Sequence, residues 1–255
     1  MQISRTGLTV TGRILSLVLF ALLPFLAACG QAPSVTGRHH PLYPGIQDGE
    51  FFIEPVAAKY LTEQNIRTEV DYAGPEAPGT IVVDTFARRL YHVMENGRAM
   101  RYAIAVGKEG LAFRGSAKVG AKREWPSWQP TANMLRTQPE MYGDYAAGLP
   151  GGLDNPLGAR ALYLYRGGKD TRFRIHGTVQ NASIGHATSA GCIRLFNQDA
   201  IDLYDRVEVG AAVKVRTESE SLELEGPFHE DEYGRIVQGP APETPADEIV
   251  MAAAN

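Results

Sequence analysis

The sequence predicts a mostly β fold, a sandwich or barrel-like sheet with one or two short helices. From residue 80 onward, short runs rich in Ile, Val, Tyr and Phe recur between turn residues, which is typical of β-strands. The 27 glycines and 16 prolines favour many turns. The 44% hydrophobic content can supply a sizeable core and excludes wholesale disorder.

The expected strands occupy two groups along the chain. They lie at 80–85, 90–94, 99–106, 159–165, 171–175 and 212–215. Asn96-Gly97 and Gly167-Gly168 are strong hairpin signals within the two groups. The stretch 124–158, with both tryptophans and five prolines, predicts a long irregular excursion, and excursions of that size are usually functional.

Two segments predict helices. Residues 197–207 are amphipathic, with Asn197 placed as N-cap and Asp199 in the first turn. Residues 54–64 could form a short helix that begins at Pro55, and we therefore expect 51–78 to be a helical lead-in.

The N-terminus resembles an export signal. An apolar stretch, Ile14–Leu26, follows Arg5 and Arg13, and no acid occurs among the first 28 residues. Leu-Ala-Ala-Cys29 at its end resembles a bacterial lipobox. We expect a signal peptide over 1–28 and lipidation of Cys29, the alternative being ordinary cleavage with Cys29 incidental. The Gly- and Pro-rich residues 29–50 then predict a tether.

Charge is distributed unevenly. The net charge is −4, but residues 217–255 carry ten acids and one base, which predicts an acidic disordered tail. The remainder is mildly basic and lacks the dense Lys/Arg runs of nucleic-acid binders, so nucleic acid is not an expected partner.

Several chemistries have no motif in the chain. The serine penicillin-binding motifs, a Gly-x-Ser-x-Gly elbow, His-Glu-x-x-His, a P-loop and a dinucleotide-binding glycine pattern do not occur. One mature thiol and scattered histidines do not make a familiar zinc site. We expect no metal and no cofactor.

The residues that remain suit nucleophilic catalysis. If Cys29 is lipidated, Cys192 is the one thiol left, and His176 ends a predicted strand 16 residues earlier. A neighbouring imidazole can take the proton of a thiol nucleophile. The Gly191 and Cys192 N–H groups could form an oxyanion hole, and Arg194 could hold a substrate carboxylate. The alternative is a buried structural cysteine with a structural histidine.

The complete string resembles the YkuD-type L,D-transpeptidase catalytic domain over roughly 79–216. The resemblance is carried by Ile175-His176-Gly177-Thr178, Ser183-Ile184-Gly185 and Ser189-Ala190-Gly191-Cys192-Ile193-Arg194, with Ile81-Val82-Val83-Asp84, Leu90-Tyr91 and Asn155-Pro156-Leu157-Gly158 upstream. Many members of that family have His or Lys where this chain has Ala190.

The resemblance implies roles and partners. Cys192 would be the nucleophile and His176 the proton donor and acceptor, with Arg194, Gly191, Gly177 and Ser189 in substrate binding. The substrate would be a tetrapeptide stem of peptidoglycan, whose third residue acylates the cysteine as D-Ala leaves. An amine then takes the acyl group to form a 3→3 cross-link, and carbapenems would inhibit. Residues 124–158 would cap the site.

Other functions remain open at this point. Water as the acceptor would give a carboxypeptidase or amidase, and an envelope protein could also be the group that is joined to peptidoglycan. A non-catalytic wall-binding lipoprotein is the alternative from a different class, although it would need neither Cys192 nor His176. The expected location is the periplasmic face of the cell envelope.

Overall fold

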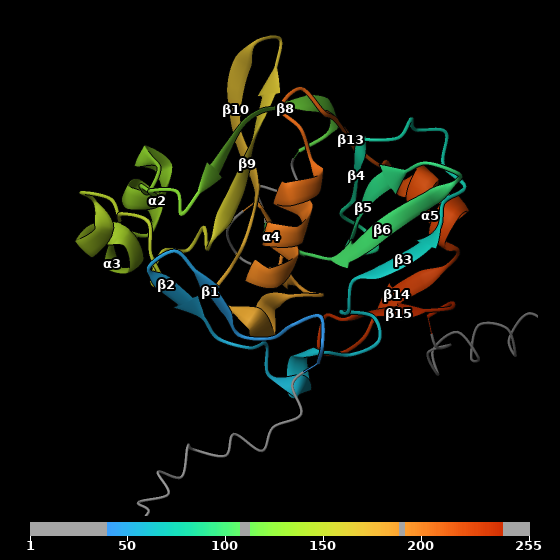
Figure 1. Cartoon of the computed structure of the whole chain (residues 1–255), viewed down its shortest axis with the longest axis horizontal. Helices are drawn as coiled ribbons and strands as arrows, with labels where there is room; N and C mark the ends of the chain where they lie inside the picture. The colour runs from blue at the N-terminus through green and yellow to red at the C-terminus, as the bar shows by residue number, and fades with distance from the viewer. Residues whose placement is uncertain (1–39, 108–112, 189–191, 242–255) are drawn as a thin grey trace, which may run out of the picture. The chain divides into compact units, whose positions relative to one another are not determined.

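The computed structural model describes residues 40–107, 113–188 and 192–241. Within them, an eleven-stranded sheet carries most of the structure (Figure 1). Its strand order is β11-β7-β12-β10-β9-β8-β13-β4-β5-β6-β3. The strands are β3 (Thr68–Asp71), β4 (Ile81–Asp84), β5 (Arg89–Met94), β6 (Arg98–Ala103), β7 (Ala105–Gly107), β8 (Gly115–Glu124), β9 (Arg160–Arg166), β10 (Lys169–His176), β11 (Ala187–Thr188), β12 (Ile193–Arg194) and β13 (Ala212–Val215). The expected mostly β fold is confirmed.

Two antiparallel meanders make up the middle of the sheet. One is β4-β5-β6 and the other is β8-β9-β10. The strand β13 joins them, parallel to β4 and antiparallel to β8. Asn96 and Gly97, at φ 60° and 67°, make the turn between β5 and β6, as this dipeptide predicts.

The helix α4 (Asn197–Arg206) fills the concave side of the sheet. Its Ala200 and Leu203 are buried in one cluster with Leu162, Leu164 and Ile175 of β9 and β10. The predicted helix is therefore confirmed. The prediction that Asn197 is its N-cap was wrong, because the N-cap is Phe196 and the Asn197 side chain bonds elsewhere in the fold.

The strand β8 was not expected from the sequence. Only Ala117 and Val119 in its first half are buried, so its alternation of apolar residues is short and partly carried by a small side chain. The register slips between Val119 and Ala121 opposite β9, and a Cβ at Gly120 would lie 2.2 Å from the Tyr165 ring. The glycine therefore lets the ring lie against the backbone at this irregularity.

The N-terminal expectations need two corrections. Residues 40–50 are packed rather than a tether: Tyr43 is completely buried, and β1 (Ile46–Asp48) pairs with β2 (Phe51–Ile53). The lead-in 51–78 holds β2, β3 and one 3₁₀ turn, η1 (Ala58–Tyr60), instead of a helix of 54–64. Packing of the segment against the rest of the fold decides this, since a helix this short is marginal by itself.

The acidic tail also needs correction over 217–241. It forms α5 (Glu218–Glu225), which begins with a capping box at Thr217, and the hairpin of β14 (Phe228–Glu230) and β15 (Ile236–Gln238). Its acids pair with buried cations: Glu225 with Arg216, and Glu230 with Arg88 at 2.5 Å. The composition of 217–255 predicts that its acidic side chains are solvated, because their cationic partners, Arg216 and Arg88, lie outside this segment.

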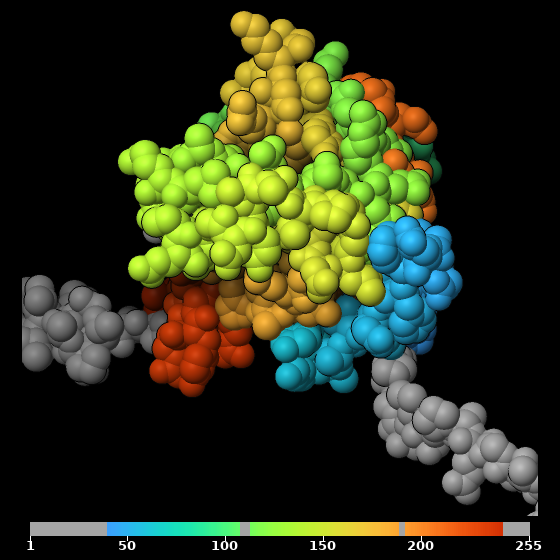
Figure 2. Space-filling view, turned by 90° about the vertical axis from the view of Figure 1, so that its left-hand side faces the viewer, coloured from blue at the N-terminus to red at the C-terminus, as the bar shows by residue number. Residues whose placement is uncertain are grey.

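The excursion between β8 and β9, residues 125–158, is named the cap. It contains α2 (Ala132–Thr137), α3 (Pro139–Tyr142) and η2 (Gly143–Tyr145), and it forms the yellow-green front of the face in Figure 2. The buried Asn155 amide donates to the carbonyl oxygens of Pro126, Leu149 and Pro150. This one side chain therefore ties the two ends of the cap together.

Three expected segments lie wholly or partly outside the described residues. They are the signal peptide 1–28, the first part of the tether with Cys29, 29–39, and the end of the tail from 242. Across the described ranges, the structure contains no helix that is both long and apolar enough to cross a membrane.

Candidate active site

The two residues expected to carry the chemistry lie on neighbouring strands. β10 and β12 are parallel, with Ile175 opposite Ile193 and His176 opposite Arg194. Ile175 and Ile193 point into the core, so His176 and Arg194 lie on the other face of the sheet. Cys192 directly precedes β12, and the structure therefore brings Cys192 and His176 to one end of adjacent strands.

His176 is 4% exposed. Its Nδ1 lies 2.6 Å from the carbonyl oxygen of Gly177, which can only accept, so Nδ1 carries the hydrogen and Nε2 of the neutral ring is the acceptor. Burial lowers the pKa of His176 to about 4, against the raising effect of the Gly177 carbonyl. The positive charges of Arg194 and Arg174 lower this pKa further. The imidazole is neutral at pH 7 and can accept a proton.

Cys192 is a partly buried thiol. Its Sγ donates to the carbonyl oxygen of Arg172 over 3.8 Å. Arg172 has a positive φ of 65° and lies in an irregularity of β10, where the register shifts between Asp170 and Arg174. A local distortion of the strand thus supplies the acceptor for the thiol.

The remaining expected site residues fall into two groups. Arg194 is partly buried, and its Nη1 donates to Gln180 Oε1 over 3.0 Å. Gly177 is buried directly after His176, and its N–H donates to the carbonyl oxygen of Arg160. Ser189 and Gly191 lie outside the described residues.

Asn197 supports the site, although the sequence suggested only a helix cap. Its Oδ1 accepts the Ala159 N–H over 3.0 Å. A Cβ at Gly177 would lie 2.1 Å from this oxygen, and one at Gly158 would lie 2.2 Å from it. The start of α4, the end of the cap and the turn after His176 therefore meet without room for side chains at either glycine.

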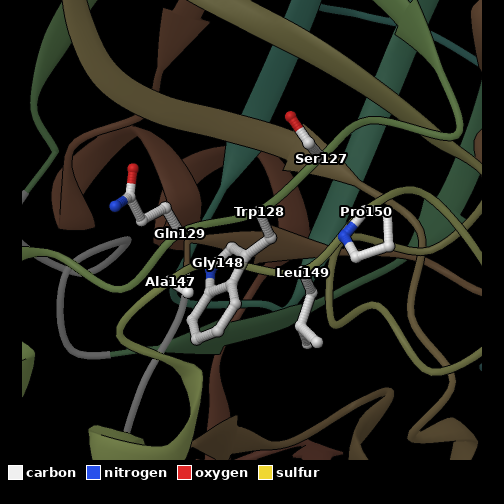
Figure 3. A pocket seen from close by; sticks show the side chains of 7 residues that line it. All are labelled: Ser127, Trp128, Gln129, Ala147, Gly148, Leu149 and Pro150. Carbon is white, nitrogen blue, oxygen red and sulfur yellow. The ribbon is translucent and has the colours of Figure 1, made fainter.

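The cap has a pocket of its own. It measures about 340 Å³ and is lined by residues that include Trp128 and Leu149, which form an isolated antiparallel bridge and point to the same side of the cap (Figure 3). Neither His176 nor Cys192 lines it, so it is separate from the chemistry described above.

The part of the chain that the structure describes contains no cluster of side chains suited to a metal ion. Among residues 40–107, 113–188 and 192–241, no group of three or more His, Cys, Asp or Glu side chains could hold a metal ion.

These features define a β-rich protein with a cysteine and a neutral histidine at one end of its sheet. Residues 78–215 match the family model of the L,D-transpeptidase catalytic domain, YkuD, and the chain belongs to this family.

Individual relatives agree with this assignment. The chain is 36% identical over 138 residues to the probable L,D-transpeptidase ErfK/SrfK of Escherichia coli, covering 53% of this chain and 43% of that protein. It is 34% identical over 137 residues to the probable L,D-transpeptidase YbiS of Escherichia coli, with 52% and 43% covered. The chain thus spans less than half the length of these relatives.

A solved structure from Brucella melitensis, described as a probable carnitine operon oxidoreductase, is 50% identical. It covers 60% of this chain and 96% of its own, at a TM-score of 0.44.

Proposed function

We propose that the protein is a peptidoglycan L,D-transpeptidase in which Cys192 is the nucleophile and His176 the base. The observation that carries the proposal is the position of His176: buried, neutral at pH 7, fixed as the Nδ1–H tautomer, and one parallel strand away from Cys192. A neutral acceptor beside a thiol is the requirement for general-base activation of a nucleophile.

The reaction needs the thiol to turn from the Arg172 carbonyl toward His176 Nε2. As Nε2 takes the proton, sulfur attacks the carbonyl carbon of the third stem residue. The carbon–nitrogen bond to D-Ala then breaks, and the leaving amine takes the proton from His176, which leaves a thioester on Cys192. An acceptor amine attacks this thioester, gives a proton to His176, and the thiol leaves protonated.

The charges near the site suit an anionic substrate. Arg194 and Arg174 both act electrostatically on His176, so they lie close enough to influence groups bound there. The stem peptide of peptidoglycan carries carboxylates on either side of the attacked carbonyl. Cationic side chains at this position favour such a donor over a neutral amide.

The acyl acceptor defines the alternatives. Water would make the enzyme a carboxypeptidase or amidase, and the amine of an envelope protein would make it a protein-attachment enzyme. A wall-binding lipoprotein without activity is the alternative from another class. The neutral, tautomerically fixed His176 favours catalysis over pure binding.

The proposed location is the periplasmic face of the envelope, with lipidation at Cys29. Wild-type protein should fractionate with membranes, and Cys29→Ser should release it or leave it unprocessed. Recovery of unmodified wild-type chain from the soluble periplasm would contradict this part of the proposal.

The test of the reaction uses purified protein, tetrapeptide and pentapeptide muropeptides, and a carbapenem. Wild type should release D-Ala from the tetrapeptide only and form a carbapenem adduct at Cys192. Cys192→Ala should abolish both, and His176→Ala should slow acylation by about 10²-fold or more.

Two matched substitutions serve as controls. Cys29→Ser removes the other thiol, and His229→Ala removes a histidine on β14; both should leave the rates unchanged. Activity in Cys192→Ala, or a preference for pentapeptide, would overturn the proposal.

A further inference from the structure

A second cation lies beside the nucleophile. The strand β10 lies between β9 and β12. Arg174 is opposite Tyr163 in β9, and the next residue, Ile175, is opposite Ile193 in β12. The parallel register, continued one residue back, puts Arg174 level with Cys192. Arg174 and His176 are two residues apart in the strand, so both are on the face opposite the core.

The guanidinium of Arg174 is fixed from two directions. It lies over the Tyr163 ring, with Cζ 4.0 Å from the ring centroid. Its Nη1 and Nη2 donate to the two oxygens of Asp170, each over 2.7 Å. The Arg174 side chain is 15% exposed, so solvent and ligands reach part of it. The stacked ring and the two-point carboxylate contact together set the plane of the group.

Two N–H donors of the Arg174 guanidinium are not used by these contacts. An arginine has five N–H donors. One Nη1–H goes to Asp170 and the other to the Phe173 carbonyl, while Nη2 uses one hydrogen on Asp170. The Nε–H and the second Nη2–H, which share one edge of the guanidinium, have no partner among the described residues. This edge has the spacing of the two oxygens of a carboxylate.

We propose that this edge of Arg174 binds a carboxylate of the acyl donor and so makes Arg174 a substrate-specificity residue of the site. The inference rests on the proposed function for the identity of the donor. Two carboxylates of a tetrapeptide stem are within its chemistry: that of the leaving D-Ala and that of the third residue's side chain. Asp170 and Tyr163 act as positioning residues, because they hold the guanidinium and leave the binding edge open.

The first test needs no transpeptidase activity. In full-length protein with Cys29→Ser, Cys192 is the single thiol. Its sulfur displaces iodide from either iodoacetate or iodoacetamide, forming an S–C bond and releasing iodide. These reagents differ in the carboxylate, so their rate ratio reports a carboxylate site beside the sulfur. Arg174→Gln should lower the iodoacetate-to-iodoacetamide ratio by about three- to tenfold, the range of one ordinary net hydrogen bond at a partly exposed site.

Two control variants separate binding from structure and from net charge. Asp170→Asn keeps an acceptor for the Arg174 guanidinium and removes a negative charge, so the ratio should stay or rise. The alternative is that Arg174 only stabilises the irregular part of β10 through its contact with Asp170. In that case Asp170→Asn and Arg174→Gln would change the ratio alike, and this result would overturn the proposal. Arg98→Gln removes an exposed cation on β6 and should leave the ratio unchanged. If Arg174→Gln does not fold, Arg174→Lys keeps the charge without the edge and should give a smaller fall.

The second test names the carboxylate. Acylation is compared for the tetrapeptide, for the donor with a D-Ala amide, and for the donor with the third residue's side-chain carboxylate amidated. Wild type should lose kcat/KM with one amide, and Arg174→Gln should be insensitive to that same change. Equal losses in both proteins would overturn the proposal. Absence of turnover with every donor would refute the proposed function, while the alkylation ratio would still decide the role of Arg174.

Discussion

Ending the chain at Arg216 should destabilise the domain by about 4 kcal/mol, because residues 217–241 complete a buried ionic cluster. Arg216 is 3% exposed and bonds both Asp84 and Glu225. The Ser221 hydroxyl donates to the buried Asp84 over 2.8 Å. Truncation removes Glu225 and Ser221 and leaves Arg216 with one carboxylate. It also removes Glu230, but this carboxylate is half exposed, so the loss of its pair with Arg88 adds about 1 kcal/mol at most.

The magnitude follows from those two losses. Removing one partner of a buried ion pair costs about 3–5 kcal/mol, and the surviving Asp84 contact puts the loss of Glu225 near the lower limit. A hydrogen bond to a charged group contributes about 1.5–3 kcal/mol. Because the two groups share one cluster, their effects are not additive, and about 4 kcal/mol is the expected total.

Urea unfolding of three chains provides the measurement. Full-length protein and a chain ending at residue 241 should have the same midpoint, while the chain ending at Arg216 should unfold at a much lower urea concentration. Glu225→Gln against Glu223→Gln is a matched pair on one helix, since Glu223 is exposed. Equal midpoints for the two truncations, or for the two glutamines, would refute the reasoning.

Three further outcomes are expected. Asn197→Ala should cost about 1–3 kcal/mol by thermal unfolding, because the Ala159 N–H loses its acceptor; an unchanged midpoint would contradict this. The pKa of His176 is lowered to about 4, so its neutral form stabilises the fold above the unfolded pKa of about 6.5, and that stability is lost as pH falls toward 4. The urea stability of wild type relative to His176→Gln should therefore shrink by roughly 3 kcal/mol between pH 7.5 and 4, whereas a constant difference would exclude this linkage. Asp48→Ala removes the contacts of 2.6 and 3.0 Å with Arg160 and should raise several-fold the rate at which chymotrypsin cleaves the β1–β2 hairpin at Phe51 or Phe52; a rate equal to that of wild type would contradict this.

The sequence was sufficient where local chemistry and tertiary structure agree. Asn96-Gly97 supplies two positive φ angles, and the runs on either side pair as β5 and β6. The strand β8 escaped prediction because Ala117 and Val119 are its buried residues in a run of Gly, Ser and Lys. Its pairing depends on edges supplied by β9 and β13, which no local pattern contains.

The tail was misread for a similar reason. Acids at 217–255 predict solvation when counted alone. Arg216 and Arg88 were part of the sequence throughout, but their burial beside Glu225 and Glu230 follows only from the folded sheet. Composition therefore describes the balance of a segment and says nothing of which charges have partners.

Some residues of the site could be predicted from the sequence and others could not. Cys192 and His176 could be predicted because their residue types and spacing carry the chemistry, and the structure brings them to adjacent strands. Asn197 and Arg174 could not, since their positions depend on register. Arg174 comes level with Cys192 through the parallel register of β10 and β12.

The position of β13 has a consequence for the order in which the chain can fold. Val213 pairs with Ile81, 132 residues earlier, and within the described ranges no other strand lies between the two meanders. A chain that emerges from its N-terminus can complete each meander early, but β4 and β8 keep open edges until residue 215 is free. Pairings so distant in sequence slow folding, and open edges invite association with other chains. The interval between emergence of β8 and of β13 is therefore the period when this protein most needs protection from aggregation.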